Sequence, residues 1–144
     1  MAQLRYEPWT LLSRLHEDIN RTFNHWADDE SSSATAQWSP AVDVEEYADR
    51  FELFVDLPGV LASDVDITLD SGVLTLAGDR NPIRSSEDLL NARRERGTGR
   101  FHRRFILPDT VDAEKVKARE QNGVLAVTIP KQAKALPRKI KVAV

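Results

Sequence analysis

The sequence predicts an all-β, immunoglobulin-like antiparallel β-sandwich that carries an N-terminal amphipathic helical arm and a flexible C-terminal tail. Three observations predict this fold. The middle of the chain contains short stretches in which apolar and polar residues alternate, turn signals separate these stretches, and no strong helical period lies between them. We therefore divide the chain into an arm at 1–39, a sandwich at 40–130 and a C-terminal extension at 131–144.

Composition limits the classes of protein to which the chain can belong. Its 144 residues are 41% hydrophobic and 30% charged, which is enough apolar material for one packed domain. The absence of cysteine excludes disulfides, thiol nucleophiles and thiolate metal sites, and it fits a reducing compartment. No apolar stretch of about 18 residues occurs, and the first residues lack a signal pattern. We therefore expect a cytoplasmic protein with no stable membrane association.

The arm is predicted to form an amphipathic helix over about 8–26. Its apolar residues are three or four positions apart, so they form one stripe along a helix. A polar linker rich in Asp and Ser follows, and no neighbouring segment covers the stripe. The stripe must fold back on the domain or become buried in another chain. With Trp9 at its margin, the stripe consists of Trp9, Leu12, Leu15, Ile19, Phe23 and Trp26.

The sandwich is predicted from alternating strands and their turns. In the first strand, Phe51, Leu53 and Val55 share one face, as expected for a half-buried strand. Ser71-Gly72 and Asn122-Gly123 are typical of tight turns that join antiparallel strands. The predicted strands are 51–57, 65–70, 73–77, 101–107, 116–120 and 124–129.

The interval between Gly78 and Gly99 is too long for a hairpin loop in a compact sandwich. Residues 89–94 within it are predicted to form a short extra strand. A protruding loop that carries a strand can pair with the sheet edge of another chain. The loop is therefore a candidate for contact between copies.

The tail is basic and ends in an alternating apolar pattern. Residues 131–144 contain five Lys or Arg residues and no acidic residue. Ile140 and Val142 alternate with lysine or alanine, which is typical of a strand, and the period of two also permits a register shifted by two residues. Two interpretations remain open: a detachable anchor, or the last strand of the domain. Two prolines that flank the basic linker favour the anchor.

No catalytic, cofactor or metal site is predicted. His16 and His25 lie nine positions apart, too far for a two-ligand clamp, and His102 is alone on its strand. The Asp-rich stretch 64–70 lacks the glycine and the glutamate that a calcium loop needs. No nucleotide-binding or nucleophile motif occurs. The formal net charge of -3 argues against nucleic acid as a partner.

Arg103 stands on the same predicted strand face as Phe101 and Phe105. Arginines between aromatic residues also occur in RNA-binding strands, but the order of residues here does not match that pattern. A lone charge on an inward face is costly unless it is paired. We therefore expect Arg103 to form an ion pair with a carboxylate at a dimer boundary.

Four motifs in this order resemble those of the small heat-shock proteins, the Hsp20 or α-crystallin group. Phe54-x-Asp56-Leu57-Pro58-Gly59 is similar to their upstream signature, and Ala118-x-x-x-Asn122-Gly123-Val124-Leu125 is similar to their consensus. Ile140-x-Val142 resembles their C-terminal motif, and 99–105 resembles the strand that carries their structural arginine, here Arg103. Glu120 is a departure, because many members have an apolar residue there. The long loop resembles that of bacterial and plant members, in which its strand is exchanged across a dimer.

The resemblance implies an α-crystallin domain and an ATP-independent holdase chaperone without cofactor or enzymatic activity. Such a protein is a dynamic homo-oligomer of dimers that binds partly unfolded proteins and prevents their aggregation. The alternative is a monomeric β-sandwich co-chaperone adaptor that binds one folded partner. The client-binding surface would be the stripe of the arm. The other expected sites are a tail anchor of Ile140 and Val142, an anchor groove on a neighbouring dimer formed by Val65, Ile67, Val116 and Ala118, and a dimer interface of Leu89, Leu90, Ala92, Arg94 and Arg103.

Overall fold

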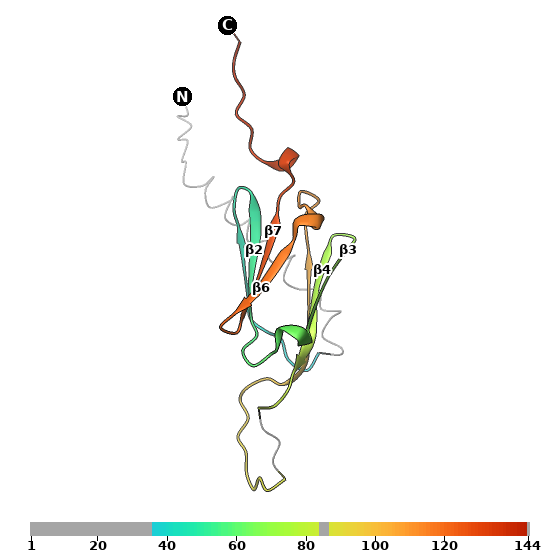
Figure 1. The fold of residues 1–144 in the computed structure, drawn as a ribbon, viewed down its shortest axis with the longest axis vertical. Helices are drawn as coiled ribbons and strands as arrows, with labels where there is room; N and C mark the ends of the chain where they lie inside the picture. Colours follow the sequence, from blue (N-terminus) through green and yellow to red (C-terminus); the bar gives the residue numbers. More distant parts are fainter. Residues whose placement is uncertain (1–35, 84–86, 144) are drawn as a thin grey trace, which may run out of the picture.

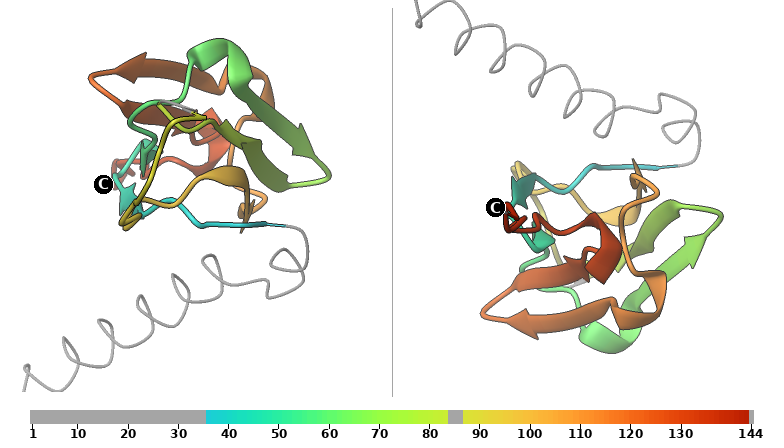
Figure 2. Two further views of the ribbon diagram at one scale, coloured as in Figure 1. Left: turned by 90° about the horizontal axis from the view of Figure 1, so that it is seen from below. Right: turned by 90° about the horizontal axis from the view of Figure 1, so that it is seen from above.

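Two antiparallel sheets pack face to face in the computed structural model, which describes residues 36–83 and 87–143 (Figures 1 and 2). The predicted all-β sandwich is confirmed. The helix predicted at 8–26, with its apolar stripe, lies outside the described residues. Within 36–83 and 87–143, no helix has the length and apolar character needed to cross a bilayer.

The sheets contain four and three strands. Their orders are β1-β2-β7-β6 and β3-β4-β5, so β1, β6, β3 and β5 are edge strands. The first sheet consists of β1 (Val42–Glu46), β2 (Arg50–Asp56), β7 (Val124–Pro130) and β6 (Lys117–Gln121), and the second of β3 (Val65–Asp70), β4 (Val73–Arg80) and β5 (Gly99–Ile106). Short 3-10 helices are η2 (Ala62–Asp64), η3 (Ala113–Lys115) and η4 (Ala133–Ala135).

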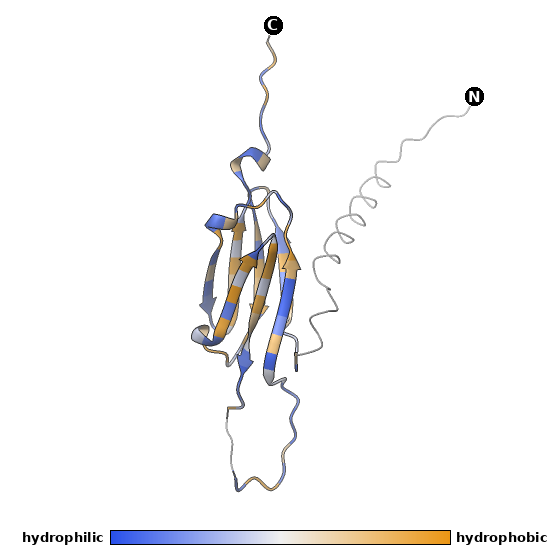
Figure 3. Ribbon diagram, turned by 90° about the vertical axis from the view of Figure 1, so that its right-hand side faces the viewer, coloured by the Kyte–Doolittle hydropathy of each residue, from blue (hydrophilic) through white to orange (hydrophobic). Residues whose placement is uncertain are grey.

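The core lies between the inner faces of the two sheets. Strand register places Val55 opposite Leu125 and Leu53 opposite Val127 in one sheet. Because successive side chains point to opposite faces, the buried core residues of β2, β4, β5 and β7 alternate with less buried ones, whereas β6 is exposed along its whole length. Figure 3 shows this alternation of hydropathy along the strands. The buried apolar residues are Phe51, Leu53, Val55, Leu57, Val60, Leu74, Leu76, Phe101, Phe105, Leu107, Val111, Leu125, Val127 and Ile129.

Both predicted tight turns are confirmed. Ser71 and Gly72 have φ of 50° and 77°, and Asn122 and Gly123 have φ of 55° and 80°. Two successive positive φ values are typical of the type I′ turn, whose twist matches that of paired antiparallel strands. These turns join β3 to β4 and β6 to β7.

The structure differs from the expectation at β1 and in the long loop. The sequence pattern gave no strand at Val42–Glu46, yet these residues pair with β2. The strand predicted at 89–94 is wrong for the single chain, because 87–98 form no strand and belong to neither of the two sheets of the described residues. The loop projects from one end of the sandwich, and the tail leaves from the other end (Figure 1).

The tail does not continue either sheet. After β7 the chain forms η4, and 136–143 contain no strand. The structure therefore rejects the alternative in which the end of the tail is the last strand of the domain.

Candidate functional site

An apolar hollow, the anchor groove, opens between the edge strands β3 and β6, where the two sheets of the sandwich separate. It encloses about 150 Å³, similar to engineered cavities that hold a benzene-sized group. Its floor is formed by core side chains from the end of β2, the following turn and β7. The groove is lined by Leu57, Val60, Ala62, Val65, Ile67, Ala118, Arg119, Glu120 and Leu125.

Three of the four residues expected to form this groove line it. Val65 and Ile67 come from β3, and Ala118 comes from β6. Val116 is not among the lining residues and instead packs against the core just before β6 begins. This part of the predicted groove is therefore corrected. The cause is that β6 begins after Val116, so this side chain belongs to the connection between η3 and β6.

Glu120, where the chain departs from the family pattern, is exposed in the structure. Its carboxylate accepts a hydrogen bond from the Gly123 N–H at 2.9 Å across the β6–β7 turn. Glu120 lies opposite Leu125 in the register and lines the groove. The acidic residue thus stabilises the turn and gives the groove one polar end.

The two rims of the groove carry opposite charges. On β3 the inward residues Val65, Ile67 and Leu69 are half-buried, and the outward residues that alternate with them, Asp66, Thr68 and Asp70, are exposed and mostly acidic. On β6 the outward residues Lys117 and Arg119 are exposed and basic. A segment that entered the groove would therefore meet an acidic strand on one side and a basic strand on the other.

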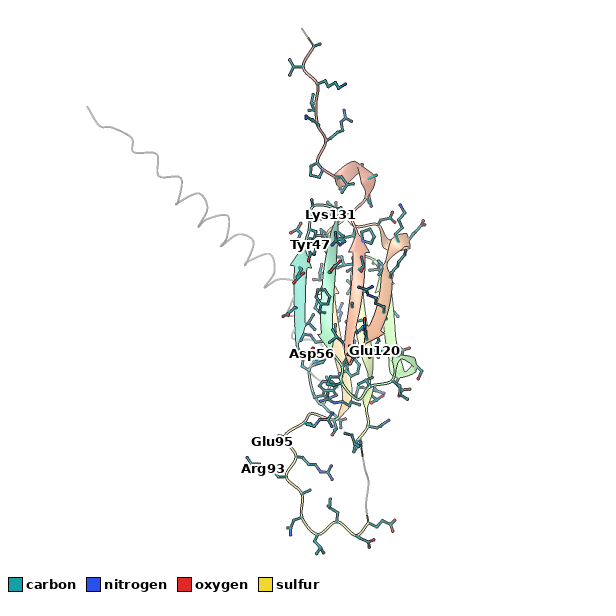
Figure 4. The ribbon with its side chains drawn as sticks, turned by 60° about the vertical axis from the view of Figure 1, so that its left-hand side comes forward. Tyr47, Asp56, Arg93, Glu95, Glu120 and Lys131 are labelled. Atoms are coloured by element: carbon teal, nitrogen blue, oxygen red, sulfur yellow. The ribbon has the colours of Figure 1, made fainter. Side chains whose placement is uncertain are left out.

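The two expected anchor residues are exposed. Ile140 is 79% and Val142 is 90% exposed, although burial of either side chain would be favourable. Lys131 fixes the root of the tail, because its ammonium lies 2.7 Å from the Glu46 carboxylate. Figure 4 places Lys131 at one end of the sandwich and Glu120 at the other. The tail thus leaves the molecule at the end remote from the Glu120 side of its own groove.

The residues expected at the dimer interface lie in two places. Leu89, Leu90, Ala92 and Arg94 are exposed on the projecting loop, and the exposed fraction of Leu90 is 93%. Across the molecule, β1 ends the four-stranded sheet with one side free of strand pairing within the described residues. A single chain thus presents both a loop segment and an unpaired sheet edge.

Arg103 lies on the inward side of β5, half-buried and opposite Leu76 in the register. Its guanidinium donates hydrogen bonds to Ser39 Oγ at 3.1 Å and to the Pro40 carbonyl at 2.9 Å. It also lies 5.5 Å from the centre of the Phe105 ring. In the described part of this chain no carboxylate forms an ion pair with Arg103, so the carboxylate expected at a dimer boundary is not supplied within it.

Sequence reasoning missed a second arginine on an inward strand face, the buried Arg80 at the end of β4. It is 7% exposed, donates to the carbonyls of Gly97 and Pro58, and lies 3.8 Å from the centre of the Trp38 ring. Burial, followed by the nearby charge of Arg96, lowers the pKa of Arg80 below its ordinary value. Arginine nevertheless remains protonated in proteins. One sequence signal could have indicated this burial: Arg80 lies on the inward face of β4, two residues after Gly78.

Trp38 completes this cluster, which we call the loop-stem joint (Trp38, Arg80 and Gly97). Its indole N–H donates to the Gly99 carbonyl at 2.8 Å, and its ring meets Phe101 edge-on at 5.3 Å. A Cβ at Gly97 would lie 2.7 Å from the Trp38 Cβ, which explains why glycine is needed there. The joint therefore ties the segment before β1 to the base of the projecting loop.

The part of the chain that the structure describes contains no cluster of side chains able to hold a metal ion. Across 36–83 and 87–143, no three His, Cys, Asp or Glu side chains converge as metal ligands would. The Nδ1 atom of His102 is buried without a hydrogen-bond partner, and His16 and His25 lie outside the described residues. The groove and the exposed tail remain the features that point to a role.

Comparisons with known proteins agree with this geometry. A model of the Hsp20/alpha crystallin family matches residues 43–144. Small heat shock protein C2 of Rickettsia felis is 35% identical over 112 residues, which are 78% of this chain and 73% of that protein. Heat shock protein 16 of Schizosaccharomyces pombe is 34% identical over 124 residues, which are 85% of this chain and 87% of that protein.

A solved structure is similar as well. The small heat-shock protein from Xylella fastidiosa, described as having a distinct high order structure, superposes with a TM-score of 0.65. It is 44% identical, and the match covers 75% of this chain and 99% of that chain. The family match, the two relatives and the sandwich with its groove and tail together show that the chain belongs to the Hsp20/alpha crystallin family, the small heat-shock proteins, which are ATP-independent chaperones and not enzymes.

Proposed function

We propose that this protein is a cytoplasmic holdase that works as a dynamic homo-oligomer of dimers and binds partly unfolded proteins without ATP. Members of the family are oligomeric and bind non-native proteins. One observation carries the proposal for this chain: each copy has an open apolar groove and an exposed apolar anchor that leaves from the remote end of the molecule. When copies bind one another, the anchor of one copy can fill the groove of another.

The tail anchor is proposed to bind the groove of a neighbouring dimer. Burial of Ile140 and Val142 is worth roughly 1.5–3 kcal/mol for each side chain. Ordering of the tail and loss of translational freedom cost a comparable amount. A single anchor therefore binds weakly and exchanges readily, whereas many anchors on one particle bind with avidity. This balance supports an assembly that is large and still dynamic.

The dimer is proposed to form through the projecting loop. The segment 89–94 of one copy would pair with the free edge of β1 in a second copy, which satisfies backbone groups on both. Leu89 and Leu90 would then be buried at the contact. Arg103 would find a carboxylate there in addition to Ser39 and Pro40.

The client surface is proposed to be the apolar stripe of the N-terminal arm. Apolar contact is non-directional, so such a stripe suits clients of varied sequence. Within the assembly the stripes would cover one another, and heating would uncover them.

The test is suppression of aggregation of a heated client protein, followed by light scattering without ATP. We expect the full-length protein to suppress it. The variant Leu12→Ser, Leu15→Ser, Ile19→Ser should lose most of this protection, because the stripe loses its apolar surface. The matched control, Arg14→Ser, Asp18→Ser, Arg21→Ser, changes the opposite face of the predicted helix and should protect normally. Equal protection by both variants would contradict the assignment of the client surface, and no protection by the unaltered protein would contradict the holdase.

A further inference from the structure

The outward face of β3 is acidic towards both ends of the strand, with the uncharged Thr68 between Asp66 and Asp70. Register places Ile67 opposite the buried Leu76, so Val65, Ile67 and Leu69 face inward and the residues between them face outward. The outward positions include Asp66 and Asp70, and Asp64 directly precedes the strand. All three are exposed, and none forms an ion pair within the described residues. The neighbour of Asp66 on β4 is the uncharged Ala77.

The tail carries positive charge, opposite to that of the outward face of β3, and its charged and apolar residues also alternate with a period of two. Lys139 and Lys141 alternate with Ile140 and Val142, and the described part of the tail contains no acidic side chain. When this segment is extended, the two apolar residues point to one side and the two lysines to the other.

Residues that lie opposite one another on neighbouring strands share a face, whatever the direction of the strands. A tail that lay along the free edge of β3, with its apolar residues in the groove, would place its lysines beside Asp66 and the flanking carboxylates. Along β6 the same tail would place its lysines beside the outward Lys117 and Arg119, because Ala118 and Glu120 face inward. Like charges at such positions are destabilising.

We propose that the tail of a second copy docks as an additional strand along the edge of β3, with Lys139 and Lys141 paired to the outward carboxylates of that strand. The inference rests on the proposed binding of the tail in the groove, and it adds the strand, the register and a dependence on salt. Only the register with Ile140 and Val142 in the groove presents two lysines. A shift by two residues puts Val142 and Val144 there and leaves Lys141 beside Ala143. Charge pairing therefore selects the first register.

The experiment measures subunit exchange between two fluorescently labelled populations of the full-length protein, at about 0.05 and 0.5 M salt, where screening differs strongly. We expect Lys139→Gln, Lys141→Gln to speed exchange at low salt about fivefold, as two exposed ion pairs permit. High salt should likewise speed subunit exchange of the unaltered protein, because it screens the ion pairs. It should speed exchange of the variant little, because the variant lacks these pairs. The matched control, Lys134→Gln, Arg138→Gln, removes the same amount of charge from tail residues that do not alternate with Ile140 and Val142. It should change the rate of subunit exchange less than twofold.

Reversing the charges on both partners is a stricter test. Asp64→Lys, Asp66→Lys alone should speed exchange, and Lys139→Glu, Lys141→Glu in the same chain should slow it again. Unchanged rates in Lys139→Gln, Lys141→Gln, or an equal effect of the control pair, would overturn the inference.

The reference variant Ile140→Gly, Val142→Gly distinguishes failure of the charge pairing from failure of the proposed tail docking. If it breaks the particle into dimers while the lysine variants change nothing, the anchor stands and the charge pairing is wrong. If it leaves the particle mass unchanged, tail docking itself is wrong, and this inference fails with it.

Discussion

At the scale of single residues, the loop-stem joint holds together three segments that are distant in the sequence. Trp38 precedes β1, Arg80 ends β4, and Gly97 precedes β5. The buried guanidinium is stabilised by two backbone carbonyls and an aromatic face, because a buried charge without partners would be costly. Glycine at 97 lets the backbone approach the indole closely.

Replacing Trp38 with alanine should destabilise the fold by about 2 kcal/mol, because the half-buried ring no longer covers Arg80 and Phe101. Trp38→Phe is the matched control. It keeps an aromatic face over the guanidinium and loses the hydrogen bond to Gly99, so it should cost about 1 kcal/mol. Differential scanning calorimetry at one fixed protomer concentration checks this. Equal melting temperatures for the alanine variant and the unaltered protein would show that the joint contributes no stability.

At the scale of elements, the strands most accurately predicted are those with a clear alternation of apolar and polar residues. Around β2 and β3 each inward residue is apolar and the turn signals are strong, so the sequence pattern contains the information. β1 escaped prediction because it is short and has only Val42 and Val44 as apolar residues, and its pairing with β2 defines it. The strand predicted at 89–94 is absent from the single chain, and we propose that it forms only when it pairs with a second copy.

The residues of the groove also divide into those that the sequence predicts and those that it does not. Val65, Ile67 and Ala118 were predictable from strand patterns and the family resemblance. Leu57, Val60 and Leu125 were not, because they belong to the core by pattern and only the separation of the two sheets makes them a floor. Arg80 was missed for a related reason. Its partner Gly97 lies across the long loop, a contact that depends on tertiary structure.

The loop element carries a prediction of its own. In an Ile140→Gly, Val142→Gly background, which should consist of dimers, Leu89→Ser, Leu90→Ser should yield monomers. Loss of two buried leucines should raise the dissociation constant at least about 100-fold. Analytical ultracentrifugation measures the change. Ile83→Ser, which alters an equally exposed residue outside 89–94, is the control and should remain dimeric. Dimers that persist in the leucine variant would show that the loop is not the interface.

At the scale of the whole molecule, the described residues fold into one sandwich that leaves apolar groups open in the groove, on the projecting loop and on the tail. The groove lies between β3 and β6, and the anchor extends from the other end of the sandwich. Under the proposed function, such a protein would gain stability by association, and weak individual contacts would let it dissociate when clients appear. The division into arm, sandwich and extension remains a prediction, since residues 1–35 of the arm lie outside the described residues.

The central claim is that the tail of one copy occupies the groove of another, and the cysteine-free sequence allows a direct measurement. One population carries only Ala118→Cys, and a second carries only Val142→Cys. After the two are mixed, exchanged and oxidised, we expect a disulfide-linked species of twice the chain mass that joins one chain of each kind. A chain carrying both cysteines that closes on itself at the mass of one chain, with no mixed species in the first experiment, would contradict the account.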